Sequence, residues 1–159
     1  MTQKTLSVWL RIVALFAGAA GLSIFILVLP GAIANYLVLL PGTGWFAVMA
    51  RGVCYGLCLP FAAAIVEFYL ICRRIGQDRS FTAANARSLR AIGFLSMADT
   101  ALVFVLLIGL VAAQALDALF VLAVVLLMLV GVLVTVAAFT LSHLVLKAWQ
   151  IKEENELTI

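Results

Sequence analysis

The chain has 159 residues, of which 67% are hydrophobic and 11% charged, and its mean hydropathy is +1.27. A soluble globular chain is about half apolar and about a quarter charged, so this composition excludes an ordinary soluble domain and requires lipid as solvent. The net charge of +3 is no nucleic-acid signature, because the basic residues cluster beside apolar runs, and we expect no direct nucleic-acid partner.

Four long apolar runs predict an all-α fold, an integral membrane four-transmembrane-helix bundle that forms a single domain over residues 1–159. About 20 apolar residues span the hydrocarbon, where only helices and closed barrels satisfy their backbone groups. These runs are longer than barrel strands and do not alternate. The predicted spans are residues 12–29, 53–72, 91–113 and 118–146.

The first span is too long for the apolar core of a signal peptide, so we interpret it as retained in the mature protein. Pro30-Gly31 is expected to end it. A loop with Asn35 and Pro41 follows, and the second helix starts as early as Trp45. Between the third and fourth spans, residues 114–117 are expected to form a tight turn.

Residues 73–90 form a basic linker between the second and third spans. Thr82 is predicted to cap a helix, with its hydroxyl facing the amide of Asn85, and this helix continues into the third span. The tail, residues 147–159, is acidic and ends on apolar residues.

Both termini are predicted to lie in the cytosol. Cytosolic loops of membrane proteins carry an excess of Lys and Arg. This orientation places nine of the ten basic residues inside and only Arg51 outside. Trp9, Trp45 and Trp149 stand near span ends, where an amphipathic ring prefers the headgroup layer.

The three cysteines, Cys54, Cys58 and Cys72, all fall in one apolar segment. The chain has a single histidine, so the ligand spacing of a zinc site is missing, and we expect buried, reduced cysteines with no metal and no cofactor. Known catalytic motifs are also missing, and we expect no enzyme activity.

Small residues predict where the first two spans pack. Gly52-x-x-x-Gly56 on the second span allows close backbone approach, and so do small residues on the first span. Those on the first span are Ala14, Ala17, Gly18 and Gly21. Formation of a homo-oligomer through the same surface is the alternative.

Placing an ionisable side chain in the hydrocarbon of a membrane costs free energy, so each such residue is expected to have a structural or functional role. Asp99 is the deepest and shares a helix face with Ser96 and Thr100. One hypothesis is a polar cluster that binds a cation or relays a proton. Its members would be Asp99, Glu67, His143, Thr140 and Arg11. The alternative is structural, with Asp99 bonded to Thr140 or His143, or protonated, and Glu67 and Arg11 reaching for the interface.

The exposed linker and tail form the second candidate site, a docking surface for a partner. The linker contributes Arg73, Arg74, Arg79, Phe81 and Asn85, and the tail contributes Glu153, Glu154, Glu156, Leu157 and Ile159. The simplest explanation of the basic linker is topology and attraction to anionic lipid. The sharper hypothesis is that the acidic tail folds back on the linker and forms one composite surface.

The linker pattern Phe81-Thr82-x-x-Asn85 and the Glu-rich tail ending Leu157-Thr158-Ile159 resemble a family of small four-span bacterial membrane proteins of unknown function. Members often stand beside a small helix-turn-helix regulator, so the resemblance implies a regulatory role, such a regulator as partner, and a place in the inner membrane. The expected function is therefore a non-enzymatic regulatory or accessory protein that presents its linker and tail to a cytosolic partner. The alternative is a small transporter or channel component that uses the region around Asp99.

Overall fold

Long helices make up almost all of the part of the chain that the computed structural model describes, which is residues 3–37, 44–77, 80–112 and 118–157. The elements are α1 (Gln3–Ser23), a π-helical turn η1 (Ile24–Val28), α2 (Leu29–Leu37), α3 (Gly44–Ile75), α4 (Ala83–Ala112) and α5 (Ala118–Leu157). The expected tight turn at 114–117 lies outside these residues.

Four helical stretches are long and apolar enough to cross a membrane: Ser7–Asn35, Gly44–Ile75, Ala83–Ala112 and Ala118–Asn155. The all-α, four-span prediction is therefore confirmed. The helices extend past the predicted spans, because the apolar pattern marks the hydrocarbon layer and not the helix. The 30 residues of α4 measure about 45 Å at 1.5 Å per residue, against about 30 Å of hydrocarbon.

Pro30 does not end the first helix, contrary to expectation. The chain remains helical from α1 through η1 into α2 and ends at Leu37. Proline breaks a helix because it lacks an N–H and its ring clashes with the carbonyl four residues back. Here a wider π-helical turn ends at Val28, two residues before Pro30, and the amide of Leu29 donates to the carbonyl of Ile24, five residues back. Pro30 is the second residue of α2, and the helix continues through it to Leu37.

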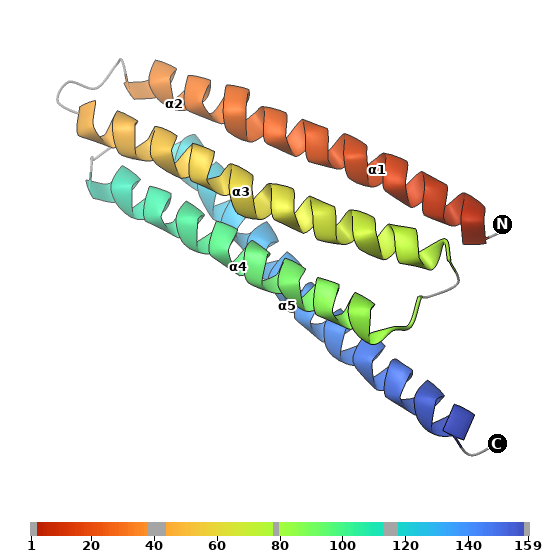
Figure 1. The fold of residues 1–159 in the computed structure, drawn as a ribbon. Helices are drawn as coiled ribbons and strands as arrows, with labels where there is room; N and C mark the ends of the chain where they lie inside the picture. Colours follow the sequence, from red (N-terminus) through yellow and green to blue (C-terminus); the bar gives the residue numbers. More distant parts are fainter. Residues whose placement is uncertain (1–2, 38–43, 78–79, 113–117, 158–159) are drawn as a thin grey trace.

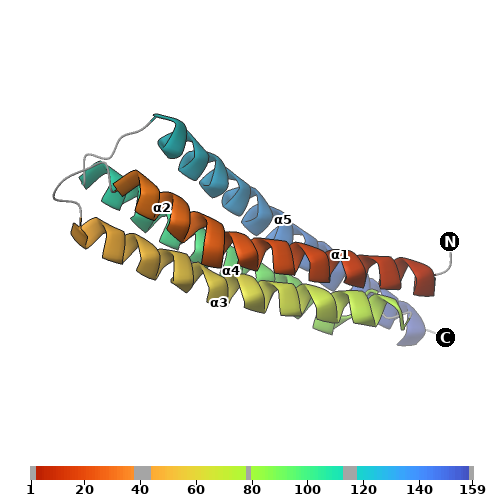
Figure 2. The same ribbon diagram turned by 90° about the horizontal axis from the view of Figure 1, so that it is seen from above.

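The helices pack in chain order, each against the next. The first helical stretch (α1, η1 and α2) packs on α3, α3 packs on α4, and α4 packs on α5. Within the described residues α5 has no other helix as a neighbour, and it crosses α4 at an angle (Figures 1 and 2). Both termini and the connection between α3 and α4 lie at one end of the molecule (Figure 1).

The largest buried cluster lies toward the other end of the molecule. Its members come from α2, α3, α4 and α5, and they are Ile33, Phe46, Ala50, Val53, Cys54, Leu57, Val103, Leu106, Leu110 and Val124. The exposed apolar side chains of α5 cover most of its length, as expected for a helix that faces lipid.

Small residues allow the first and second spans to approach, but only on one side of the contact. Gly18 faces Ile65 and Gly21 faces the Phe61 ring, so the prediction is confirmed for these two glycines. Of the predicted alanines, Ala14 is buried and Ala17 is exposed. The prediction for the Gly52-x-x-x-Gly56 pattern is wrong. Among the described residues, a Cβ added at Gly52 would meet nothing within 4 Å beyond its own helix, and one at Gly56 would meet Leu102 of α4. The face of α3 that contacts α1 carries Phe61 and Ile65, and α1 supplies the small residues.

Candidate functional site

The arginine end is our name for the region at the termini: the first turns of α1, the chain from Arg73 to Arg90, and α5 beyond Leu146. Here α1 closes the C-terminus of α3. The hydroxyl of Ser7, a buried residue, donates to the carbonyl of Cys72 at 2.8 Å, and Arg11 donates to the carbonyl of Arg73 at 3.5 Å. The carbonyl of Cys72 also accepts from the amide of Gly76 at 3.3 Å, so Ser7 adds a second bond there. Arg11 supplies a donor to Arg73, one of the last carbonyls of the helix, which lack intrahelical donors. Gly76 is required next to these bonds, because a Cβ would collide with the hydroxyl of Ser7.

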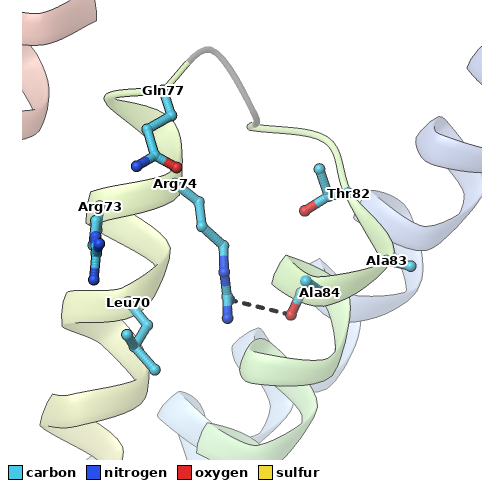
Figure 3. Close-up of a pocket in the computed structure, with 7 residues that line it drawn as sticks. All are labelled: Leu70, Arg73, Arg74, Gln77, Thr82, Ala83 and Ala84. Atoms are coloured by element: carbon cyan, nitrogen blue, oxygen red, sulfur yellow. Dashed lines mark hydrogen bonds between the residues drawn. The ribbon is translucent and has the colours of Figure 1, made fainter.

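Arg74 joins α3 to α4 across the linker. Its Nη1 donates to Ser88 Oγ at 2.8 Å, to Asn85 Oδ1 at 3.3 Å and to the carbonyl of Ala84 at 3.4 Å. Figure 3 shows the side chain reaching from α3 toward the first turn of α4. These charge-assisted bonds from the Arg74 guanidinium hold the C-terminal end of α3 close to the start of α4.

The linker motif has a structural role. Thr82 Oγ1 accepts from the amide of Asn85 at 3.3 Å, so the predicted N-cap is confirmed. The side chain of Asn85 is 1% exposed and donates to the carbonyl of Ser80 at 2.8 Å. A buried side chain offers no surface to a partner, whereas Phe81 is 58% exposed. Of the two, only Phe81 therefore remains available for docking.

Two hollows border these arginines. One of about 600 Å³ lies between the C-terminal end of α3 and the start of α4, and its lining includes Arg73, Arg74, Gln77 and Thr82 (Figure 3). The other, of about 410 Å³, is lined in part by Glu67, Arg74, Arg87 and Ser88. Glu67 therefore faces the arginine end.

The tail is a straight continuation of α5. The hydroxyl of Ser142 donates to the carbonyl of Ala86 at 2.7 Å, so this part of α5 is level with the first turn of α4. Helix α5 then continues for eleven residues past Leu146, to Leu157, which is about 16 Å at 1.5 Å per residue. Glu153 and Glu154 thus stand on a helix that projects beyond the other three and does not fold back on the linker (Figure 1). Arg79, Ile159 and the side chains of Glu156 and Leu157 lie outside the description.

The second candidate region surrounds Asp99, halfway along α4. Its Oδ1 is buried and accepts no hydrogen bond. The residue lines a cavity of about 300 Å³ together with Ser96, Thr100 and the aromatic rings of Phe25, Phe61 and Phe68. The rings of Phe25 and Phe61 meet edge to face at 5.3 Å.

The predicted polar cluster is not brought together. Thr140 and His143 are exposed, and the hydroxyl of Thr140 donates to its own helix at Val136. The reason is the register of the antiparallel pair of α4 and α5, in which Ser96 donates to the carbonyl of Gly131 at 3.1 Å. Asp99 is therefore level with residues near 128, and Thr140 lies at least ten residues further along, or about 15 Å or more away along the axis.

Glu67 and Arg11 do not join Asp99 either. Glu67 lines the hollow of Arg74 and Arg87, and Arg11 donates to the end of α3. The structural alternative, with Asp99 bonded to Thr140 or His143, is also not observed. Hydrogen bonds do connect the helices, as that alternative expected, but their donors are the hydroxyls of Ser7, Ser96 and Ser142 and the guanidinium groups of Arg11 and Arg74.

The connecting residues that the sequence did not reveal are Ser7, Ser88 and Ser142, and it named Ser96 only as a neighbour of Asp99. A serine in an apolar run is inconspicuous, because its hydroxyl can also bond to its own helix. Position within the run gives a weak signal, since Ser7, Ser88 and Ser142 all lie near the basic ends of their helices. Cys54 and Cys72 are buried, and within the described ranges no three His, Cys, Asp or Glu side chains gather as metal ligands.

The fold and its long apolar helices define a four-helix membrane protein. The chain belongs to the family described as "Protein of unknown function (DUF2975)", which it matches over residues 38–159. The resemblance to a family of unknown function is thereby confirmed. The matched range contains α3, the linker, α4, α5 and the tail, while α1, η1 and α2 lie before it. Searches of curated proteins and of solved structures gave no match.

Proposed function

We propose that this protein is a non-enzymatic regulatory or accessory protein of the inner membrane, with the arginine end in the cytosol, where it binds a cytosolic protein. The distribution of charge supports this orientation, because nine of the ten Lys and Arg residues would then be cytosolic. A small helix-turn-helix regulator is the first partner to test, on the strength of the family resemblance.

The observation that carries the proposal is the projecting end of α5. A helix needs about 20 residues to cross the hydrocarbon, and α5 has 40. Its last turns carry Lys147, Lys152, Glu153 and Glu154, which do not belong in lipid. A charged helix that projects past the bundle presents a rigid surface to the aqueous phase, and rigid surfaces lose little entropy on binding.

The described residues of the linker supply a second surface at the same end of the molecule as this helix (Figure 1). Arg73, Arg87 and Arg90 are exposed, while Arg74 and Asn85 hold the backbone from within. An acidic or mixed-charge protein surface would complement the pair of basic linker and projecting helix. The complementarity would speed association and select the partner.

Photo-cross-linking in living cells tests the proposal. A photoreactive amino acid replaces Ile151, which is 52% exposed on the projecting helix. The matched control replaces Leu119, which is 80% exposed at the opposite end of the same helix. We expect a discrete cytosolic protein cross-linked at Ile151 and not at Leu119. A chain truncated after Lys152 should recover less of that protein in affinity purification. Equal cross-linking at both positions, or none at Ile151, would count against docking.

The rival function, a small transporter or channel component, has one observation in its favour: Asp99 is a buried carboxyl beside a cavity. A pathway across the membrane would normally contain further polar groups in series. Of those expected, Thr140 and His143 are exposed on α5 and away from the cavity. Docking therefore remains the better supported function.

A further inference from the structure

The cavity beside Asp99 combines one carboxyl with apolar walls. It has a volume of about 300 Å³ and lies between residues of α3, α4, α5 and η1. Three phenylalanines contribute to the lining, and the remaining residues are aliphatic or small except for Ser96, Asp99 and Thr100. Small-molecule sites in proteins have this character: mostly apolar walls with a few polar groups that fix orientation.

The two hydroxyls next to Asp99, those of Ser96 and Thr100, already donate their hydrogen bonds to backbone carbonyls. Ser96 Oγ donates to the carbonyl of Gly131 at 3.1 Å, and Thr100 Oγ1 donates to the carbonyl of Ser96 at 2.8 Å. A hydroxyl has one proton to donate, so neither can also donate to the carboxyl of Asp99. This accounts for the buried Oδ1 that accepts no hydrogen bond.

A carboxylate in the middle of a membrane is stable only with a positively charged or hydrogen-bonding partner. The described residues around the cavity supply none, so the carboxyl of Asp99 is either protonated or, when charged, paired with a molecule from outside the chain. That molecule has to carry an N–H donor for the carboxylate and an apolar body for the phenylalanine-lined walls. An ammonium group also interacts favourably with the faces of aromatic rings.

Such a molecule can enter from the bilayer. Among the described residues, the backbone of α5 comes close to α4 and not to η1 or α3, although residues of all four elements line the cavity. The cavity is therefore bounded by two groups of helices that are not packed against each other on that side. We propose that it binds a small lipophilic amine in its ammonium form, with Asp99 as counter-ion. This site is distinct from the arginine end and does not depend on the docking function.

Equilibrium binding to the purified chain in nanodiscs of phosphatidylcholine tests the proposal. The probe is tritiated 1-adamantylamine, a rigid apolar cage with one primary amine, and its uncharged analogue is 1-adamantanol. We expect saturable binding of the amine and, because a charge-assisted hydrogen bond is lost, affinity for the alcohol weaker by about tenfold or more. Equal affinity for the two compounds, or a signal no greater than that of empty nanodiscs, would overturn the proposal.

Matched variants locate the site. Asp99→Asn should weaken amine binding by about tenfold or more, whereas Glu67→Gln, the same chemical change in the hollow of the arginine end, should leave it unchanged. Ala64→Leu, which fills the cavity from α3 without touching the carboxyl, should weaken binding of amine and alcohol alike. Unchanged amine binding in Asp99→Asn, or in Ala64→Leu, would refute the assignment to this cavity. The comparison of amine with alcohol uses the unmodified chain, and it decides the question even if a variant fails to fold.

Discussion

Arg73 and Arg74 are neighbours in the sequence with different surroundings in the structure. Arg74 is half-buried and donates to three acceptors on α4, the shortest bond being 2.8 Å to Ser88. Arg73 is exposed, and its backbone carbonyl accepts a hydrogen bond from Arg11. In the sequence the two are interchangeable as positive charges at the end of a span. The direction in which each side chain leaves the helix decides which of them holds the linker.

Replacing each arginine by glutamine should therefore have unequal effects. Arg74→Gln should lower the free energy of unfolding by about 1–2 kcal/mol, because it removes charge-assisted hydrogen bonds that are partly exposed to water. Arg73→Gln should change it by about 0.5 kcal/mol or less. Denaturant unfolding in detergent micelles, followed by circular dichroism, measures both. Similar losses for the two variants would contradict the distinct role of Arg74.

At the scale of elements, glycines allow some helices to approach closely. The Gly52-x-x-x-Gly56 pattern pointed to Gly52, whereas Gly131 is a glycine at a close contact. A Cβ on Gly131 would collide with the hydroxyl of Thr100, whereas one on Gly52 meets nothing within 4 Å. The contact at Gly131 also brings its carbonyl within reach of Ser96. A pair of glycines four residues apart allows close packing, but it does not say which neighbour uses it.

Gly131→Ala should accordingly destabilise the protein by about 1–3 kcal/mol, because the extra methyl group forces α4 and α5 apart or displaces Thr100. Gly52→Ala should be neutral or stabilising by up to about 1 kcal/mol, since alanine is the better helix former. The same unfolding measurement compares them. If Gly52→Ala proved the more damaging, the packing described here would be incorrect.

The whole molecule is a series of helices in chain order, and an even number of crossings places both termini on one side. Nine basic residues on that side predict that it is the cytosol. Because α5 has α4 as its only helical neighbour within the described residues, much of its apolar surface is left to lipid.

Reporter fusions test the orientation. Green fluorescent protein at the C-terminus should fluoresce, and alkaline phosphatase at the same place should be inactive, because the latter requires the oxidising side of the membrane. The same reporters placed after Asp117, behind three helices, should give the opposite result. The reverse pattern at both positions would mean that the arginine end is outside.

The sequence alone indicated that lipid surrounds the helices, and it also gave the number of spans, the family resemblance and the N-cap at Thr82. The reason is that hydropathy, run length and capping are local properties, which depend on residues close together in the chain. It misjudged Pro30, because the π-helical turn that accommodates the ring has no pattern of its own in the sequence. The tertiary structure alone decided which polar residues meet. Asp99 lies on α4, and Thr140 and His143 lie on α5. Both helices are apolar along most of their length, so different axial offsets between them would bury similar apolar surfaces. The hydropathy pattern therefore does not specify their register. The bonds from Ser96 to Gly131 and from Ser142 to Ala86 specify it, and they separate His143 from Asp99 and leave the carboxyl of Asp99 facing an apolar cavity.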